Sequence, residues 1–106
     1  MSLTGKGIWI WKIRNCENGD AQAIASQAVQ AGFSHVIVKI ADDAGNYNLD
    51  PNTKADLVPG LVAALRQQKI QVWGWHYIYG YNPLGEADKA FERISRLGLD
   101  GLSRRW

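Results

Sequence analysis

The residues with the clearest potential for chemistry lie at the ends of two predicted strands. Lys39 lies within the segment 35–41, the pair Asp42–Asp43 follows it, and His76 lies within the segment 71–79. Polar groups at the end of a buried strand can touch a substrate. Each has a structural alternative: Lys39 can pair with Asp42 or Asp43 or extend to the strand end, and His76 can be a hydrogen-bonded core residue. The two aspartates can also serve turn chemistry.

The unusual feature of the composition is its aromatic content: five Trp, four Tyr and two Phe, mostly in or just after two short segments. Side chains alternate faces along a strand, and a lysine does not cheaply face an apolar helix layer. We therefore expect Lys39 and the strand aromatics to share the face away from the helices. Aromatic faces beside hydrogen-bonding groups suit sugar rings, although aromatic side chains also fill cores. The predicted binding residues are Lys39, Asp42, Trp9, Trp11, Trp75 and Tyr77.

The elements that must position these residues alternate along the chain. We expect strands at 7–13, 35–41 and 71–79. One helix follows the capping residue Asp20 and ends before Gly32, a second begins at 56 or 57 with Pro59 in its first turn, and a third covers 84–97. This β-α-β-α-β-α order predicts an α/β fold of three successive βα units, with parallel strands and right-handed crossovers.

The third helix carries both apolar and charged residues. We expect its apolar side chains to face inward: Leu84, Ala87, Ala90, Phe91, Ile94 and Leu97. We expect its charged side chains to face water: Glu86, Lys89, Glu92, Arg93 and Arg96.

We expect residues 1–106 to form a single domain with a flexible start at 1–6 and an aberrant tail at 102–106. The connection 98–101 after the third helix resembles the connection 32–35, which leads into a strand. This similarity indicates that a fourth strand should follow. Arg104 and Arg105 fit poorly into a strand buried on both faces, so we expect that strand not to form. The favoured interpretation is a longer architecture that has been cut, and the alternative is a natural three-unit protein with a basic tail.

Composition excludes several classes of protein. The chain is 46% hydrophobic with a net charge of +2 from scattered basic residues, which argues against disorder and against nucleic-acid binding. No apolar stretch approaches the roughly 20 residues of a membrane span, and no signal peptide is visible, which leaves a cytoplasmic location as the default expectation. The single Cys16 cannot form an intrachain disulfide or a cysteine-based zinc site. No cofactor or metal motif is present, so we expect neither.

The strand segments resemble those of family 25 glycoside hydrolases, the lysozyme-type muramidases with a TIM-like β/α barrel. The segment 36–42, followed by Tyr47, Asp50 and Pro51, is similar to their second strand and loop, and 73–77 to their third strand. The resemblance spans 7–101 and implies a partial (β/α)8 TIM-like barrel, the N-terminal part of such an enzyme. It also implies sugar-site roles for Lys39 and Trp75.

The chain differs from that family at the positions of the family's catalytic carboxylates. Trp9 stands where the family has an aspartate in strand one, and the family's Asp-x-Glu at the end of strand four is absent. Glycoside hydrolysis normally needs two carboxylates flanking the bond, and adjacent Asp42 and Asp43 make a poor pair. We therefore expect no catalytic residue and no hydrolysis by this chain alone.

Three interpretations remain: an inactive barrel fragment, a carbohydrate-binding or interaction module, and a small flavodoxin-like domain whose aromatics form an oligomer interface. Three strands cannot close a barrel, and open edges invite pairing. We therefore expect a homo-oligomer in which sheet edges pair or aromatic faces bury each other, with a glycan as the possible ligand.

Overall fold

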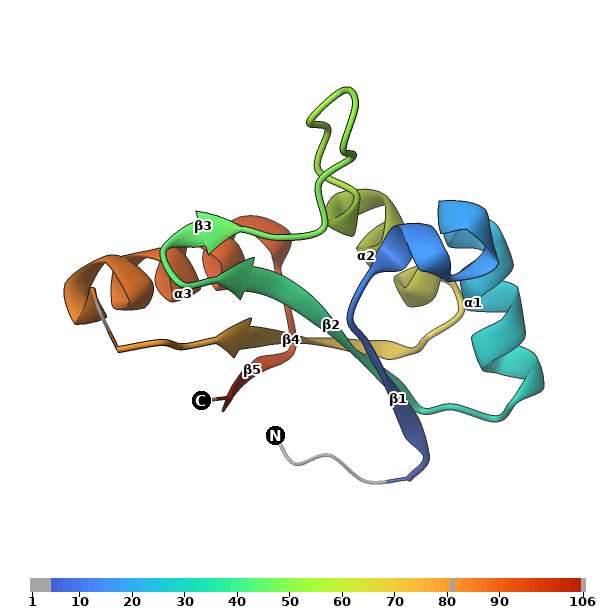
Figure 1. The fold of residues 1–106 in the computed structure, drawn as a ribbon. Helices are drawn as coiled ribbons and strands as arrows, with labels where there is room; N and C mark the ends of the chain where they lie inside the picture. Colours follow the sequence, from blue (N-terminus) through green and yellow to red (C-terminus); the bar gives the residue numbers. More distant parts are fainter. Residues whose placement is uncertain (1–4, 81, 106) are drawn as a thin grey trace.

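The computed structural model describes residues 5–80 and 82–105 (Figure 1). Four strands lie side by side in the order β1-β2-β4-β5, and a two-stranded antiparallel extension adds β3 to β2. The strands are β1 (Gly7–Ile10), β2 (His35–Asp42), β3 (Gly45–Asn46), β4 (Gln71–Tyr77) and β5 (Gly101–Arg105). The helices are α1 (Ala21–Gln30), α2 (Val58–Gln67) and α3 (Pro83–Leu97), with the 3₁₀ turns η1 (Ile13–Asn15) and η2 (Glu17–Gly19).

The predicted α/β class and the parallel pairing are confirmed. β1 pairs in parallel with β2, β2 with β4, and β4 with β5. The helices follow the same spatial order, since α1 packs on α2 and α2 on α3, and Figure 1 shows them on one side of the sheet. The carboxyl ends of the parallel strands therefore meet at one edge, where α/β proteins place their ligand sites.

The helix boundaries follow the expected capping chemistry. The Asp20 carboxylate accepts hydrogen bonds from the backbone N–H groups of Gln22 and Ala23, and Gly32 follows α1 with a φ of 74°. Pro59 lies in the first turn of α2, where its missing N–H costs little. Asp20, Gly32 and Pro59 therefore mark where α1 begins and ends and where α2 begins.

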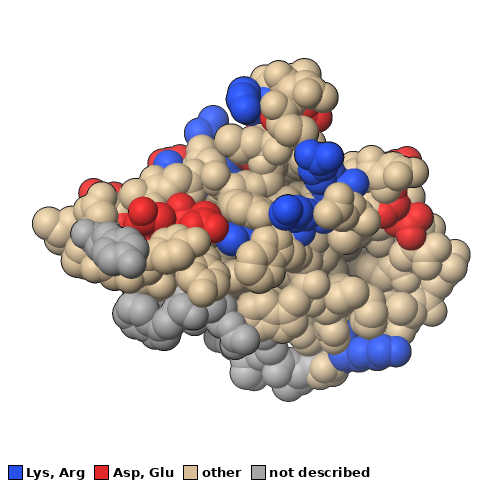
Figure 2. All heavy atoms as spheres, in the orientation of Figure 1, with Lys and Arg blue, Asp and Glu red and all other residues tan. Residues whose placement is uncertain are grey.

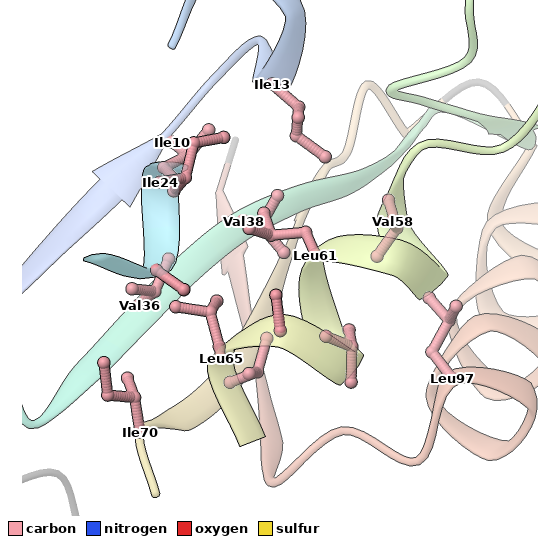
Figure 3. Close-up of a cluster of buried hydrophobic side chains, with 14 of the residues drawn as sticks. Ile10, Ile13, Ile24, Val36, Val38, Val58, Leu61, Leu65, Ile70 and Leu97 are labelled. Carbon is pink, nitrogen blue, oxygen red and sulfur yellow. The ribbon is translucent and has the colours of Figure 1, made fainter. Parts of the chain in front are cut away.

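The hydrophobic core lies between the sheet and the helices. Val36 and Val38 of β2 and Leu61 and Leu65 of α2 are fully buried there, and Ile10 closes the core beside α1 (Figure 3). These strand residues alternate with the aromatic and lysine residues of the other face, because successive side chains of a strand point to opposite sides. The core thus fixes which face of the sheet carries the candidate site.

The expectation that a fourth strand does not form is wrong. Residues 101–105, most of the predicted aberrant tail, form β5 in register with Trp73–Tyr77 of β4. Strand pairing is made by backbone groups, and β5 is the outer strand of the sheet, so the argument from a strand buried between layers did not apply. Residues 1–4 of the predicted flexible start and Trp106 lie outside the described residues.

The first strand is shorter than expected, because β1 ends at Ile10 and not at residue 13. Ile13 lies in η1 and is 1% exposed within the hydrophobic core, so it does not share a face with Trp9 and Trp11 as strand alternation would require. Trp11 follows the strand and still packs against Trp75 of β4. The third strand also ends two residues early, at Tyr77.

The predicted faces of α3 are partly wrong. Leu84 and Phe91 are 81% and 75% exposed, whereas Glu86 and Arg93 are buried. Ala87 is also exposed, whereas Ala90 and Leu97 are buried as expected. The helix turns Glu86 and Arg93 inward because each satisfies backbone or carboxylate groups at the carboxyl ends of the strands, as described below.

Candidate functional site

A β-bulge on β2 brings the two polar residues of the candidate site together. The register between β2 and β4 shifts between Lys39 and Ala41, which makes Ile40 the extra residue. Residues three apart on a regular strand point to opposite faces, and the bulge removes this conflict. Lys39 Nζ consequently lies 2.7 Å from Asp42 Oδ2. The ion pair, left open as an alternative role for Lys39, is present.

The ammonium of Lys39 is enclosed by aromatic rings. Its Nζ lies 3.9 Å from the ring centre of Tyr47, 4.3 Å from Trp11, 5.2 Å from Trp75 and 5.5 Å from Tyr77. Only 2% of the Lys39 side chain is exposed. A buried ammonium is costly without compensation, and the ring faces together with one carboxylate provide it. Lys39 therefore holds the rings in place and does not present its charge to solvent.

The three clustered tryptophans form an edge-to-face cluster with one buried and two half-exposed members. Trp75 is 4% exposed and donates its indole N–H to the carbonyl oxygen of Ile10 at 3.2 Å. Trp9 and Trp11 pack edge-on against Trp75, with ring centres 5.8 and 5.1 Å away. They are 45% and 51% exposed. A rigid indole floor with two accessible rings results, as edge-to-face packing favours.

Tyrosine side chains extend this floor along the strand ends. Tyr77 packs against Trp75 at 6.5 Å, and Tyr79 packs against Tyr77 at 4.9 Å between ring centres. A hydrogen bond to the Asp42 carboxylate raises the pKa of Tyr79, and desolvation and nearby charges act in the same direction. The Trp11 indole N–H donates to the hydroxyl of Tyr47 at 2.9 Å. Hydroxyl and carboxylate groups thus border the rings.

Two residues that the sequence analysis did not assign to the site position it: Asn48, which it did not consider, and Arg93, which it predicted to face water. The buried Asn48 donates to the carbonyl oxygens of Lys39 and Trp11 at 2.6 and 3.1 Å, and its Oδ1 accepts from the backbone N–H of Ile13 at 2.7 Å. It therefore ties the end of β1 to β2. Residue spacing in the sequence does not predict these hydrogen bonds, because the partners of Asn48 are backbone groups remote in sequence.

The second positioning residue is Arg93, which is 0% exposed. Its Nε donates to the carbonyl oxygen of Ile40 at 2.9 Å, and its Nη2 donates to the carbonyl oxygen of Tyr47 at 3.3 Å. The same guanidinium is paired with the Asp56 carboxylate. Arg93 therefore joins α3 to the bulge and to the loop that carries Tyr47.

All six predicted binding residues lie in this one cluster on the face away from the helices. Trp9 and Trp11 are the most accessible, Asp42 and Tyr77 are half-buried, and Lys39 and Trp75 are buried. Tyr47 and Tyr79 belong to the same cluster, although the prediction did not include them. For Tyr79 the available signal was its place in the aromatic-rich segment 71–79, whereas Tyr47 lies in the loop after 35–41 and was named only in the family resemblance. We call these eight residues the aromatic face.

Glu86 and His76, near the strand ends, are engaged in structural contacts. The buried Glu86 carboxylate accepts from the backbone N–H groups of Tyr79 at 2.8 Å and Gly80 at 3.3 Å. His76 is 0% exposed, and its Nε2 lies 2.5 Å from the carbonyl oxygen of Asp43. His76 is therefore a hydrogen-bonded core residue. Among residues 5–80 and 82–105, no cluster of three or more His, Cys, Asp or Glu side chains is arranged to hold a metal ion.

Comparison with known proteins gives no guide to the function of the aromatic face. No protein-family model matches the chain, and no significant match was found among curated proteins or solved structures. Within the described part of the chain, no helix is long and apolar enough to span a membrane. The function must therefore be argued from the geometry.

Proposed function

We propose that the aromatic face is a carbohydrate-binding surface without catalytic activity. The observation that carries this proposal is the pair of half-exposed indoles, Trp9 and Trp11, fixed edge-on against the buried Trp75. Sugar rings have apolar C–H faces and hydroxylated rims, so a flat indole can stack on the ring while neighbouring polar groups bind the rim.

The polar groups beside the indoles suit sugar hydroxyls. The Asp42 carboxylate is 29% exposed, and the hydroxyl of Tyr79 lies on a ring that is 48% exposed. Carboxylates accept from hydroxyl groups, and phenols both donate and accept. The buried Lys39 acts in this proposal as a positioning residue, because it holds Trp11 and Tyr47 by their ring faces and orients Asp42.

We also propose that the chain is an arc of a glycoside-hydrolase-like β/α barrel. The sequential strand order β1-β2-β4-β5 and the helices on one side of the sheet support this reading over a flavodoxin-like one. A flavodoxin-like sheet carries helices on both faces and reverses its strand order. The absence of hydrolysis in the proposal rests on chemistry: β5 has the sequence Gly-Leu-Ser-Arg-Arg, which supplies no carboxylate.

Titration of tryptophan fluorescence with chitotetraose and cellotetraose tests the proposal. We expect saturable quenching by at least one of them, since Trp9 and Trp11 are accessible. Trp9→Ala or Trp11→Ala should weaken binding about tenfold or more, because each removes roughly half of an indole from the contact.

The control is Trp73→Phe. The Trp73 ring packs over Gly101 of β5 and its indole N–H donates to Gln71, and neither contact involves the aromatic face, so the substitution should leave affinity unchanged. Two results contradict the proposal: absence of any response across both saccharides, or equal loss of affinity in Trp73→Phe and Trp11→Ala. Release of reducing ends from chitotetraose by the purified chain would refute the non-catalytic part.

A second role, self-association, is favoured by the open sheet. β1 and β5 are the outer strands, and each leaves one edge unpaired among the described residues. Two copies joined from β5 to the partner's β1 at both edges would supply eight parallel strands, the number in a closed β/α barrel.

Light scattering across a concentration series tests this second role. A stable monomer at all concentrations counts against it. If the aromatic faces and not the edges bury each other, Trp9→Ala should weaken the association; if the edges pair, it should persist.

A further inference from the structure

A pocket of about 390 Å³ adjoins the aromatic face at the carboxyl end of β1. It is lined by η1, by the residue before it and by the loop after β2, and its walls include Lys12, Arg14, Asn15, Asn46, Tyr47 and Asn48. Its size falls within the roughly 300–1,000 Å³ of small-molecule sites. We call it the basic pocket.

Two cationic side chains on the wall of the basic pocket carry their charge without a strong partner. Lys12 and Arg14 are exposed, and within the described residues neither makes a side-chain hydrogen bond or an ion pair. Arg14 acts only weakly on Asp50: the pKa of Asp50 is lowered first by the N–H groups of Thr53 and Asn52 and last by the charge of Arg14. No Asp or Glu among the described residues lines the pocket.

The charge pattern of the surface agrees with this description. Figure 2 shows Lys and Arg side chains gathered over the region of η1, with Asp and Glu side chains over β3 and α3 on one side and beyond the basic group toward α1 on the other. An anionic group in the basic pocket would therefore meet two cations without facing a carboxylate on the pocket wall.

The pocket is continuous with the aromatic face through Tyr47. This residue lines the pocket, accepts a hydrogen bond from the Trp11 indole and covers the Lys39 ammonium. A sugar stacked on Trp11 would therefore place a neighbouring residue or substituent of the saccharide beside Lys12 and Arg14. Asn15 and Asn46 offer amide groups that can bind hydroxyls at the same place.

We propose that the ligand is an acidic saccharide whose carboxylate or sulfate group binds in the basic pocket between Lys12 and Arg14. This inference rests on the proposed carbohydrate-binding function and names the class of sugar. Guanidinium and ammonium groups bind both oxyanions by charge-assisted hydrogen bonds, so the two sources share one chemistry.

The test uses three matched probes: cellotetraose, the same tetramer carboxylated at C6, and the same tetramer sulfated at C6. At low salt we expect one or both acidic tetramers to bind about tenfold or more tightly than the neutral one. The tighter of the two identifies the anion. Raising the salt from about 0.01 M to about 1 M shortens the Debye length from about 30 Å to about 3 Å and should remove most of the difference.

The double variant Lys12→Gln with Arg14→Gln should bind all three tetramers with similar affinity. Lys69→Gln with Arg66→Gln is the control, because it removes the same net charge at the opposite ends of the strands. Circular dichroism confirms folding, and the single variants Lys12→Gln and Arg14→Gln, each expected to lose part of the preference, replace the double variant if it does not fold.

The outcomes separate this inference from the proposed function. Equal affinity for neutral and acidic tetramers, lost on Trp11→Ala, would overturn the inference and leave carbohydrate binding intact. A preference for acidic tetramers that survives in the double variant would also overturn it. Binding of none of the three would overturn the inference, and it would overturn the proposed function as well if chitotetraose also fails to bind.

Discussion

The ion pair between Lys39 and Asp42 leads to an asymmetric prediction: Asp42→Asn should destabilise the protein more than Lys39→Met. The Lys39 side chain is 2% exposed, and that of Asp42 is 29% exposed, with their charged atoms 2.7 Å apart. Removing the carboxylate leaves a buried ammonium without a counter-ion. Removing the ammonium leaves a carboxylate that water and the Tyr79 hydroxyl still solvate.

The expected magnitudes follow from this difference in burial. Breaking a buried pair by removing one partner costs about 3–5 kcal/mol. Asp42→Asn should lower the free energy of unfolding by about 3 kcal/mol, the lower end of this range, because the amide oxygen still accepts a hydrogen bond and the rings around Lys39 remain. Lys39→Met should cost about 1 kcal/mol or less, since a thioether packs well against aromatic rings and an apolar replacement of a buried charge is often close to neutral.

Urea unfolding followed by far-ultraviolet circular dichroism measures both variants without depending on the tryptophans of the site. A loss of 3 kcal/mol also corresponds to a fall in Tm of roughly 12 °C or more for a domain of this size. If Lys39→Met is the more destabilising variant, or if both lie within about 1 kcal/mol of the parent, the ammonium is not held in the aromatic enclosure as described.

Two further predictions concern the residues that position the site. Arg93→Met should destabilise the protein by about 3–5 kcal/mol, because it strands the Asp56 carboxylate and two backbone carbonyls; Arg96→Met on the exposed side of α3, where the nearest carboxylate is 3.8 Å away, should cost less than about 1 kcal/mol. Similar urea midpoints for the two variants would contradict the buried role of Arg93. Tyr79 should titrate above its ordinary pKa of 10.0 in a difference spectrum between the parent and Tyr79→Phe, and Asp42→Asn should lower that midpoint. Because the pKa of Tyr79 is raised in the folded state, the protonated phenol contributes its full stabilisation below about pH 10, and this stabilisation is lost as the pH rises through the folded-state pKa. An unshifted midpoint in both proteins would show that the hydrogen bond to Asp42 is absent.

Local signals in the sequence were sufficient to predict much of the fold. The apolar run 35–41 became β2, and Asp20, Gly32 and Pro59 marked helix boundaries as their backbone chemistry requires. The argument that Lys39 must avoid the helix layer also placed the aromatic face on the correct side of the sheet. Each of these inferences depends on neighbours close in sequence or on a burial cost that only one face could meet.

The features that the sequence did not predict depend on partners distant along the chain. Arg93 points inward because Ile40, Tyr47 and Asp56 offer it acceptors, and no helical periodicity of α3 contains that information. The bulge at Ile40 likewise arises from pairing with β4. The early end of β1 and the formation of β5 reflect the same limit, since tertiary contacts outweigh local propensity.

The most direct test of carbohydrate binding is the set of indole N–H signals in a ¹⁵N-correlated NMR spectrum, recorded with and without saturating acidic or neutral tetrasaccharide. The two accessible indoles, Trp9 and Trp11, should shift on binding, while Trp73, whose ring packs over Gly101 of β5 and whose N–H donates to Gln71, should not. Single Trp→Phe variants assign the signals. If no indole shifts with any tetrasaccharide, or if Trp73 alone responds, sugars do not bind at the aromatic face.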